Sequence, residues 1–96
     1  MKIPRLSVIM GIYNSKDKDI VKMSIDSIIN QTMTDWECII CDDGSIDDTY
    51  EFLCNEYGHD GRFIFIKNNK NEGLRVALNK CIETAKAPYL VRQDAD

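Results

Sequence analysis

The sequence predicts an α/β fold with a doubly wound, mostly parallel sheet of four strands and helices on both faces. Short apolar runs alternate with segments in which apolar residues recur at helical spacing. The apolar runs are nearly continuous, which is typical of strands buried on both faces of a parallel sheet. The resulting order, strand–helix–strand–helix–strand–helix–strand, is the pattern of right-handed βαβ units.

Two strands and two helices are expected in the first half of the chain. Residues 6–12 predict the first strand, and residues 38–41, within the apolar run WECIIC, predict the second. Residues 20–31 and 49–57 predict helices, because their apolar residues fall on one face. The expected inner faces consist of Val21, Ile25, Ile28 and Ile29 in the first helix, and Phe52, Leu53 and Tyr57 in the second.

In the second half, residues 63–66 and 89–91 predict strands, and residues 74–85 predict a helix. The inner face of this helix is expected to consist of Leu74, Ala77, Leu78, Cys81 and Ala85. The last strand runs directly into acidic residues with no helix to cover it. We therefore expect residues 1–96 to be the N-terminal part of a longer domain, truncated at this point.

Charge and hydropathy limit the classes of partner. The 96 residues carry 12 Lys and Arg against 16 Asp and Glu, so no basic surface for nucleic acid is expected. No apolar run approaches the ~20 residues of a membrane-spanning helix. We expect a cytoplasmic location, with peripheral attachment to a membrane as the alternative.

The four cysteines are expected to be free thiols. Cys38 and Cys41 form a C-x-x-C pattern on a strand, where residues three apart point to opposite faces. They cannot easily bind one ion or form a disulfide together. Buried thiols in a reducing compartment are the favoured interpretation.

Polar residues follow all four expected strands, at the edge where open α/β sheets bind ligands. Asp42 and Asp43 end the second strand, and we expect one to hold the turn while Asp43 faces a ligand. A carboxylate there can accept the imide N–H of uracil or a ribose hydroxyl. Ser45 and Asp48 have the spacing of a capping box, so Asp48 is expected to serve the following helix.

Three further residues are candidates at this edge. Tyr13 offers a ring for stacking on a base, with packing at the rim as the alternative. Arg75 lies in the first turn of a helix, where a cation is unfavourable unless an anion lies near, so it is a candidate for a diphosphate. A solvated surface arginine is the other interpretation. No G-x-G-x-x-G or P-loop pattern is present.

Asp94 and Asp96 form a D-x-D pattern at the end of the last expected strand. Alternate residues of a strand point to the same side, so both carboxylates can reach one cation. Carboxylate oxygens suit Mg²⁺ or Mn²⁺, which leave coordination positions for substrate phosphates.

Five segments, taken in order and spacing, resemble the start of a family 2 glycosyltransferase with the GT-A fold. They are LSVIMGIYN, SIDSIINQT, WECIICDDGSIDDT, NEGLRVALNKCIETA and YLVRQDAD. The resemblance implies transfer of a sugar from a nucleotide-sugar, expected to be a UDP-sugar, to an acceptor hydroxyl, with inversion and with Mn²⁺ or Mg²⁺. It also implies a saccharide or lipid-linked acceptor and a role in the biosynthesis of cell-surface polysaccharides.

The resemblance also assigns roles to residues of this sequence. It implies nucleotide contacts from Gly11, Tyr13, Asp43, Arg75 and Asp94, with Tyr13 near the base, Asp43 on the uracil and Asp94 on the ribose or a metal-bound water. It implies that Asp96 ligates the metal. The family often has Pro-Thr where this chain has Gly11 and Ile12.

No catalytic base is identified, since the family's base lies beyond residue 96. We therefore expect the chain to supply only the donor and metal site, to be inactive in transfer by itself, and to self-associate through its uncovered edge strand. Two alternatives stay open: a metal-dependent nucleotidyltransferase, and a non-catalytic α/β binding module.

Overall fold

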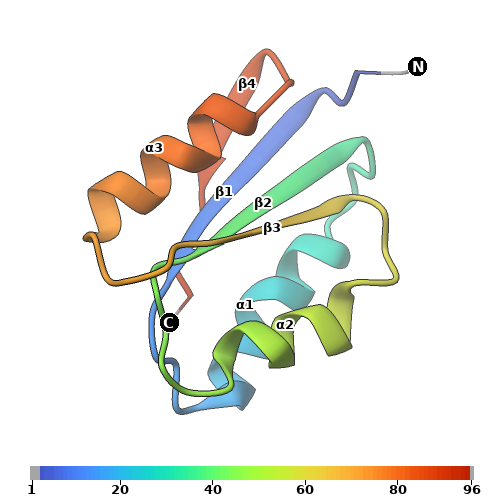
Figure 1. The fold of residues 1–96 in the computed structure, drawn as a ribbon. Helices are drawn as coiled ribbons and strands as arrows, with labels where there is room; N and C mark the ends of the chain where they lie inside the picture. Colours follow the sequence, from blue (N-terminus) through green and yellow to red (C-terminus); the bar gives the residue numbers. More distant parts are fainter. Residues whose placement is uncertain (1–2, 96) are drawn as a thin grey trace.

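The computed structural model describes residues 3–95 and confirms the predicted order of elements (Figure 1). The strands are β1 (Leu6–Ile12), β2 (Trp36–Asp42), β3 (Phe63–Lys67) and β4 (Tyr89–Arg92). The helices are α1 (Lys18–Ile29), α2 (Thr49–Tyr57) and α3 (Leu74–Thr84). None of the helices in the described range is long and apolar enough to cross a membrane.

Helix α1 begins before residue 20, where it was predicted, because Asp17 caps it. The Asp17 carboxylate accepts hydrogen bonds from the backbone N–H groups of Asp19 and Ile20, at 3.0 and 3.3 Å. An N-cap aspartate satisfies donors that the first turn of a helix leaves unpaired.

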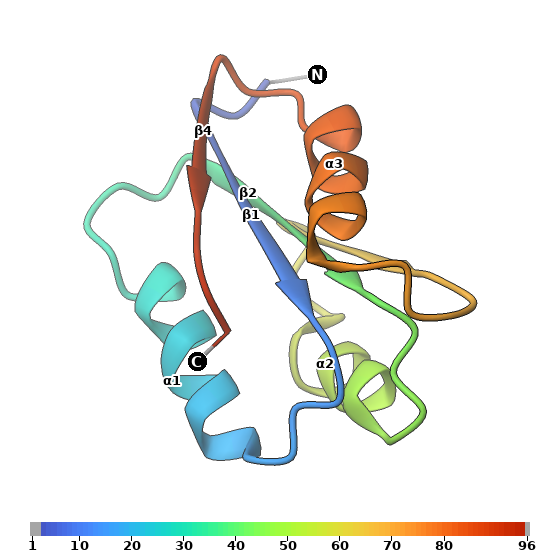
Figure 2. The same ribbon diagram turned by 90° about the vertical axis from the view of Figure 1, so that its left-hand side faces the viewer.

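All the strands pair in parallel, in the order β3-β2-β1-β4. Helices α1 and α2 cover one face of the sheet and α3 covers the other, which confirms the doubly wound prediction (Figures 1 and 2). Strand β1 lies between β2 and β4, so the segment that leaves its carboxyl end emerges near the middle of the sheet.

Each face of the sheet has its own hydrophobic core. The larger core lies between the sheet and α1 and α2, and it includes Cys38 and the inner residues of α1. The smaller core includes Cys41 and, from α3, Ala77 and Cys81. Cys38 and Cys41 therefore lie on opposite faces, as predicted, and the cysteines are free thiols.

Burial makes the core thiols poor nucleophiles. Desolvation raises the pKa of Cys38 to about 12 and that of Cys41 to about 11. The thiolate is the reactive and metal-binding form of cysteine, so these side chains act as small apolar groups.

The apolar run of β4 is typical of a strand buried on both faces, but the described structure agrees with the expectation that this strand is left uncovered. Its apolar side chains are largely exposed: Tyr89 by 72%, Leu90 by 46% and Val91 by 45%. The cause is the position of β4 at one edge of the sheet, where β1 is the one strand of the described residues that pairs with it.

A buried carboxylate holds the segment that leads into β4. Glu37 Oε2 accepts hydrogen bonds from the Ser7 hydroxyl at 2.5 Å and from the Lys86 backbone N–H at 2.7 Å. The Ser7 hydroxyl in turn accepts the N–H of Ala87 at 3.1 Å. The turn between α3 and β4 is thus bonded to side chains of β1 and β2.

We predict that Glu37→Ala lowers the free energy of unfolding by about 2–3 kcal/mol, because it removes charged hydrogen bonds and leaves buried donors unpaired. Urea denaturation followed by circular dichroism measures the change. Glu83→Ala, on an exposed position of α3, is the matched control and should change stability by less than about 0.5 kcal/mol. Equal stability of the two variants would contradict the structural role of Glu37.

Candidate functional site

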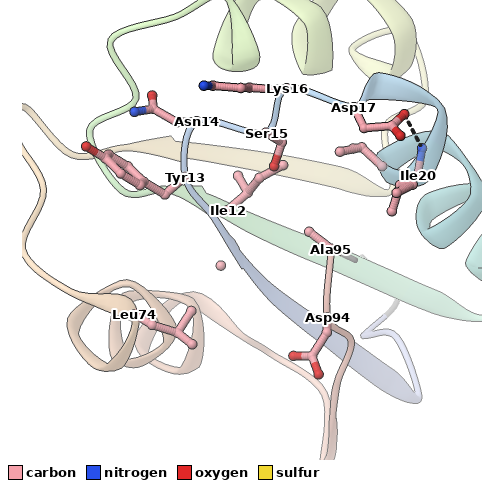
Figure 3. Close-up of a pocket in the computed structure, with 12 residues that line it drawn as sticks. Ile12, Tyr13, Asn14, Ser15, Lys16, Asp17, Ile20, Leu74, Asp94 and Ala95 are labelled. Atoms are coloured by element: carbon pink, nitrogen blue, oxygen red, sulfur yellow. Dashed lines mark hydrogen bonds between the residues drawn. The ribbon is translucent and has the colours of Figure 1, made fainter.

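Two adjoining hollows lie over the carboxyl end of β1. They share four lining residues: Gly11, Ile12, Tyr13 and Leu74. The first hollow, of about 340 Å³, extends past Lys16 to Asp94 and Ala95 (Figure 3). The second, of about 410 Å³, extends to Asp43, Asn71 and Gly73. Together they form one cleft at the sheet edge where ligands were predicted to bind.

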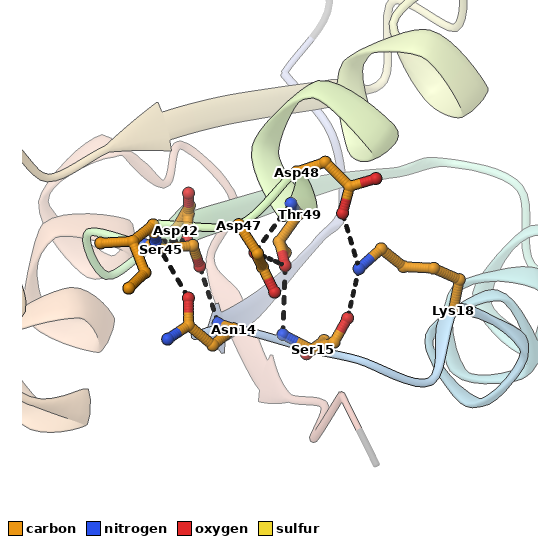
Figure 4. Close-up of polar contacts among 9 residues, drawn as sticks. Asn14, Ser15, Lys18, Asp42, Ser45, Asp47, Asp48 and Thr49 are labelled. Atoms are coloured by element: carbon orange, nitrogen blue, oxygen red, sulfur yellow. Dashed lines mark hydrogen bonds and ion pairs between the residues drawn. The ribbon is translucent and has the colours of Figure 1, made fainter.

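The chain leaving β1 is bonded to the segment that precedes α2 (Figure 4). Asn14 has a positive φ of 44°, and its backbone N–H donates to the Ser45 hydroxyl at 2.8 Å. The Asn14 side-chain oxygen accepts the N–H of Ile46 at 3.0 Å, and Thr49 accepts the N–H of Ser15 at 3.1 Å. These bonds fix the backbone that directly follows Tyr13, whose ring is 45% exposed in the cleft.

The predicted capping box before α2 is wrong. Ser45 does not cap the helix, because its hydroxyl and backbone N–H both donate to the buried Asp42 carboxylate. The N-cap residue is Asp48, whose side chain makes no capping bond and pairs instead with Lys18, at 3.2 Å. Asp47 accepts the backbone N–H of Thr49, at 3.0 Å. Asp42 is thus the carboxylate that holds the turn.

Asp43 is buried, with 3% of its surface exposed, and it holds the loop between β3 and α3. Its Oδ1 accepts the Asn68 side-chain amide at 3.0 Å and the Glu72 N–H at 2.8 Å. Its Oδ2 accepts the Gly73 N–H at 2.9 Å. The expectation that Asp43 only faces a ligand is therefore too simple, because the residue also supports the start of α3.

The pKa of Asp43 lies below its ordinary value of 3.8. Burial by itself raises this pKa, but the hydrogen bonds from Glu72, Asn68 and Gly73 and the charge of Lys80 lower it by more. Asp43 is therefore a carboxylate at neutral pH and can only accept hydrogen bonds.

Asp94 lies at the other end of the cleft. Its backbone carbonyl accepts the Ser24 hydroxyl of α1 at 2.6 Å, and its exposed carboxylate pairs with Arg92 at 3.2 Å. Asp96, the predicted metal ligand, lies outside the described residues. Within residues 3–95, no group of three or more His, Cys, Asp or Glu side chains could hold a metal ion.

The cleft gathers most of the predicted nucleotide-binding residues. Gly11, Tyr13, Asp43 and Asp94 line it, whereas Arg75 is exposed in the first turn of α3 and lines neither hollow. The side chain of Arg75 makes no ion pair or hydrogen bond with the rest of the described chain.

Several lining residues were not predicted from the sequence, and Lys16 and Leu74 are the two that bear on ligand binding. Lys16 is a cation in the first hollow, and its only signal was its position just after the first strand. Leu74 was assigned to the buried face of its helix. It is instead 48% exposed and lines both hollows.

A parallel sheet with helices on both faces and a cleft at the carboxyl ends of its strands defines a doubly wound α/β domain. Residues 7–96 match the model of glycosyl transferase family 2, and the chain belongs to that family. The resemblance seen in the sequence is thereby confirmed.

Two curated relatives illustrate the similarity. EpsE of Bacillus subtilis (strain 168), named provisionally as a glycosyltransferase, is 40% identical over 94 residues, which are 97% of this chain and 33% of EpsE. WfaP of Escherichia coli, a UDP-Glc:alpha-D-GlcNAc-diphosphoundecaprenol beta-1,3-glucosyltransferase, is 38% identical over 95% of this chain and 35% of its own length. This chain thus spans about a third of either relative.

The fold is also that of solved glycosyltransferase structures. The mannosyltransferase PcManGT of Pyrobaculum calidifontis, solved in complex with GDP-Man and Mn²⁺, superposes with a TM-score of 0.85. The match covers 99% of this chain and 28% of that one, at 23% identity. This similarity confirms the α/β fold of the GT-A type.

We predict that Asp43→Asn makes folding less sensitive to acid. Because the pKa of Asp43 is lower in the folded state than in the unfolded chain, its charge stabilises the fold at neutral pH. That contribution is lost as the pH falls from about 4 through the folded-state pKa. Urea denaturation of both proteins at pH 7 and at pH 3 measures the difference.

The asparagine variant should be less stable than the wild type at pH 7, by about 1–3 kcal/mol, and the gap should narrow at pH 3. Asp19→Asn, an exposed position on α1, is the control. A gap that is the same at both pH values would contradict a lowered pKa for Asp43.

Proposed function

We propose that this chain is the donor-binding part of a glycosyltransferase that moves a sugar from a nucleotide-sugar to an acceptor hydroxyl. The donor is expected to be a UDP-sugar, and the transfer is expected to proceed with inversion. The observation that carries the proposal is the position of Asp43, a buried carboxylate with a lowered pKa, in the same hollow as the exposed ring of Tyr13.

Asp43 retains the capacity to bind a base. An ionised carboxylate has about four acceptor positions, and the chain itself occupies three: two on Oδ1 and one on Oδ2. The remaining position on Oδ2 suits the imide N–H of uracil. The exposed ring of Tyr13 offers a face on which such a base can stack.

The diphosphate and the metal belong to the other end of the cleft in this proposal. Lys16 lines the first hollow and is available to a phosphate there. Arg75 lines neither hollow, but its exposed side chain makes no ion pair with the described chain, so we propose it as a second cation for the diphosphate. The carboxylate of Asp94 is a hard oxygen donor of the kind that Mn²⁺ or Mg²⁺ prefers, and we propose Asp96 as the direct ligand. The bound cation would neutralise negative charge on the leaving diphosphate.

We propose that the acceptor site and the catalytic base lie in other parts of the full protein. The chain spans about a third of its relatives, and the base is expected beyond residue 96. The name of WfaP describes transfer from UDP-Glc to a lipid-linked sugar. It supports a saccharide or lipid-linked acceptor. We further propose a role in cell-surface polysaccharide biosynthesis and a cytoplasmic location peripheral to the membrane.

The two alternatives have less support. A metal-dependent nucleotidyltransferase would share the acidic sheet edge, but the chain belongs to a glycosyltransferase family. A non-catalytic binding module would share the fold, and nucleotide binding that depends on metal would argue against it.

We predict that the chain binds UDP weakly, and that the binding depends on Mn²⁺. The acidic residues of the cleft repel a bare diphosphate, so chelation of the metal by EDTA should weaken binding by about tenfold or more. Isothermal titration calorimetry with Mn²⁺ and with EDTA measures the effect.

Asp96→Asn should reduce the gain in UDP affinity that Mn²⁺ produces. Glu83→Gln, on an exposed part of α3, should leave this gain unchanged. Equal affinity for UDP with Mn²⁺ and with EDTA would refute the metal-dependent donor site.

We also predict that the 96-residue chain self-associates through β4. Its exposed edge carries Tyr89, Leu90 and Val91, and an uncovered apolar edge strand readily pairs with another strand. Sedimentation velocity should show a dimer or larger species that Leu90→Lys shifts towards the monomer. The control, Ile82→Lys, changes a similarly exposed residue on α3 and should not have this effect. A wild-type chain that is monomeric at high concentration would refute the prediction.

A further inference from the structure

We propose that Leu74, seated on Gly11, forms the apolar wall that holds a nucleobase against Tyr13. The inference rests on the proposed function and adds to it a residue that contacts the ligand and a glycine that positions this residue. It concerns the hollow lined by Tyr13, Asp43 and Leu74.

Leu74 occupies an unusual position for an apolar residue of α3. The residues of this helix that face the core, Ala77 and Cys81, are fully buried. Leu74 begins the helix, is 48% exposed and lines both hollows of the cleft. An exposed apolar side chain in a cleft leaves apolar surface in water until a ligand covers it, and this surface therefore favours a ligand with an apolar face.

Gly11 provides the space in which Leu74 lies. A Cβ atom at position 11 would lie 2.5 Å from Leu74 Cδ1 and 3.7 Å from the Cβ of Ala77. The first distance is far shorter than a normal contact, so any larger residue at position 11 would push Leu74 out of its place. The role of Gly11 is therefore to let the side chain of Leu74 reach the floor of the cleft.

The backbone of Leu74 is fixed by Asp43. The Gly73 N–H donates to Asp43 Oδ2 at 2.9 Å, and Gly73 has a φ of 102°, which glycine adopts far more readily than other residues. The carboxylate proposed to bind the edge of the base thus also determines where the apolar wall begins.

Tyr13 and Leu74 enter the cleft from different sides. In Figure 3 the ring of Tyr13 lies above and Leu74 lies below on the same side of β1, and the side chain of Leu74 points towards this strand. A flat base between them would have an aromatic face on one side and an aliphatic group on the other. Its polar edge would face Asp43, which lines the same hollow.

The test is a titration of the chain with UDP and with inorganic diphosphate, both in the presence of Mn²⁺. Leu74→Ala should weaken UDP binding by about fourfold, the effect of losing roughly one methylene of apolar contact, and should leave diphosphate binding unchanged. Leu74→Met should bind UDP like the wild type, because it restores the apolar volume. Ile82→Ala, at a similarly exposed position of the same helix, is the control and should have no effect.

A double-mutant cycle tests the pairing with Gly11. Gly11→Ala should weaken UDP binding in the wild-type background, and it should have no further effect once Leu74 is alanine, because the displaced side chain is then absent. Equal effects in both backgrounds would show that Gly11 does not act through Leu74.

The outcomes separate this inference from the function on which it rests. If the wild type binds UDP and Leu74→Ala binds it equally well, the apolar wall is refuted and the donor site is retained. The apolar wall is also refuted if Leu74→Ala weakens the binding of UDP and of diphosphate to the same extent. Such a result would mean that Leu74 does not contact the base. If the wild type binds neither probe, the proposed donor site fails and the inference fails with it.

Discussion

The cleft depends on one buried carboxylate, that of Asp43, which joins the end of β2 to the loop before α3. Three donors from that loop converge on it, and none of them has another partner among the contacts of the described chain. Gly44 allows the loop to come so close, because a Cβ atom there would lie 2.2 Å from the Lys70 backbone carbon. The adjacent Asp42 and Gly44 thus place Asp43 where a carboxylate can both bind the loop and face a ligand.

The chain that leaves β1 is held by a second, independent set of bonds. Asn14 and Ser15 are bonded to Ser45, Ile46 and Thr49, and Lys18 of α1 pairs with Asp48. Tyr13 lies between this set and the central strand. The two sides of the cleft are therefore built by different loops, and each loop is anchored on residues that follow β2. This arrangement explains why the DDGSIDDT segment carries so many polar residues in succession.

The sequence predicted the elements well because their signals are local. Apolar runs and helical spacing identify β1, α2 and the order of the fold without any knowledge of packing. The errors concern contacts between segments distant in the chain. The spacing of Ser45 and Asp48 suggests a capping box, but Ser45 bonds to Asp42 and Asn14. The periodicity of α3 places Leu74 on the buried face, but the glycine opposite it lies 63 positions earlier, and no local pattern reveals that pairing. Strand β4 looks buried from its composition, and only its edge position shows that it is exposed.

The two ends of the cleft differ in how far their side chains are preorganised for a ligand. At the Asp43 end the polar groups are buried and hydrogen-bonded, so the groups that would contact a base are already in place before it binds. Binding a base there would therefore cost little conformational entropy. At the Asp94 end the carboxylate is exposed and, among residues 3–95, pairs with Arg92 alone, and exposed ion pairs contribute little stability. A cation can therefore replace Arg92 at low cost. This asymmetry fits a donor site in which the protein recognises the nucleoside, whereas the diphosphate and its metal complete the other end when they bind.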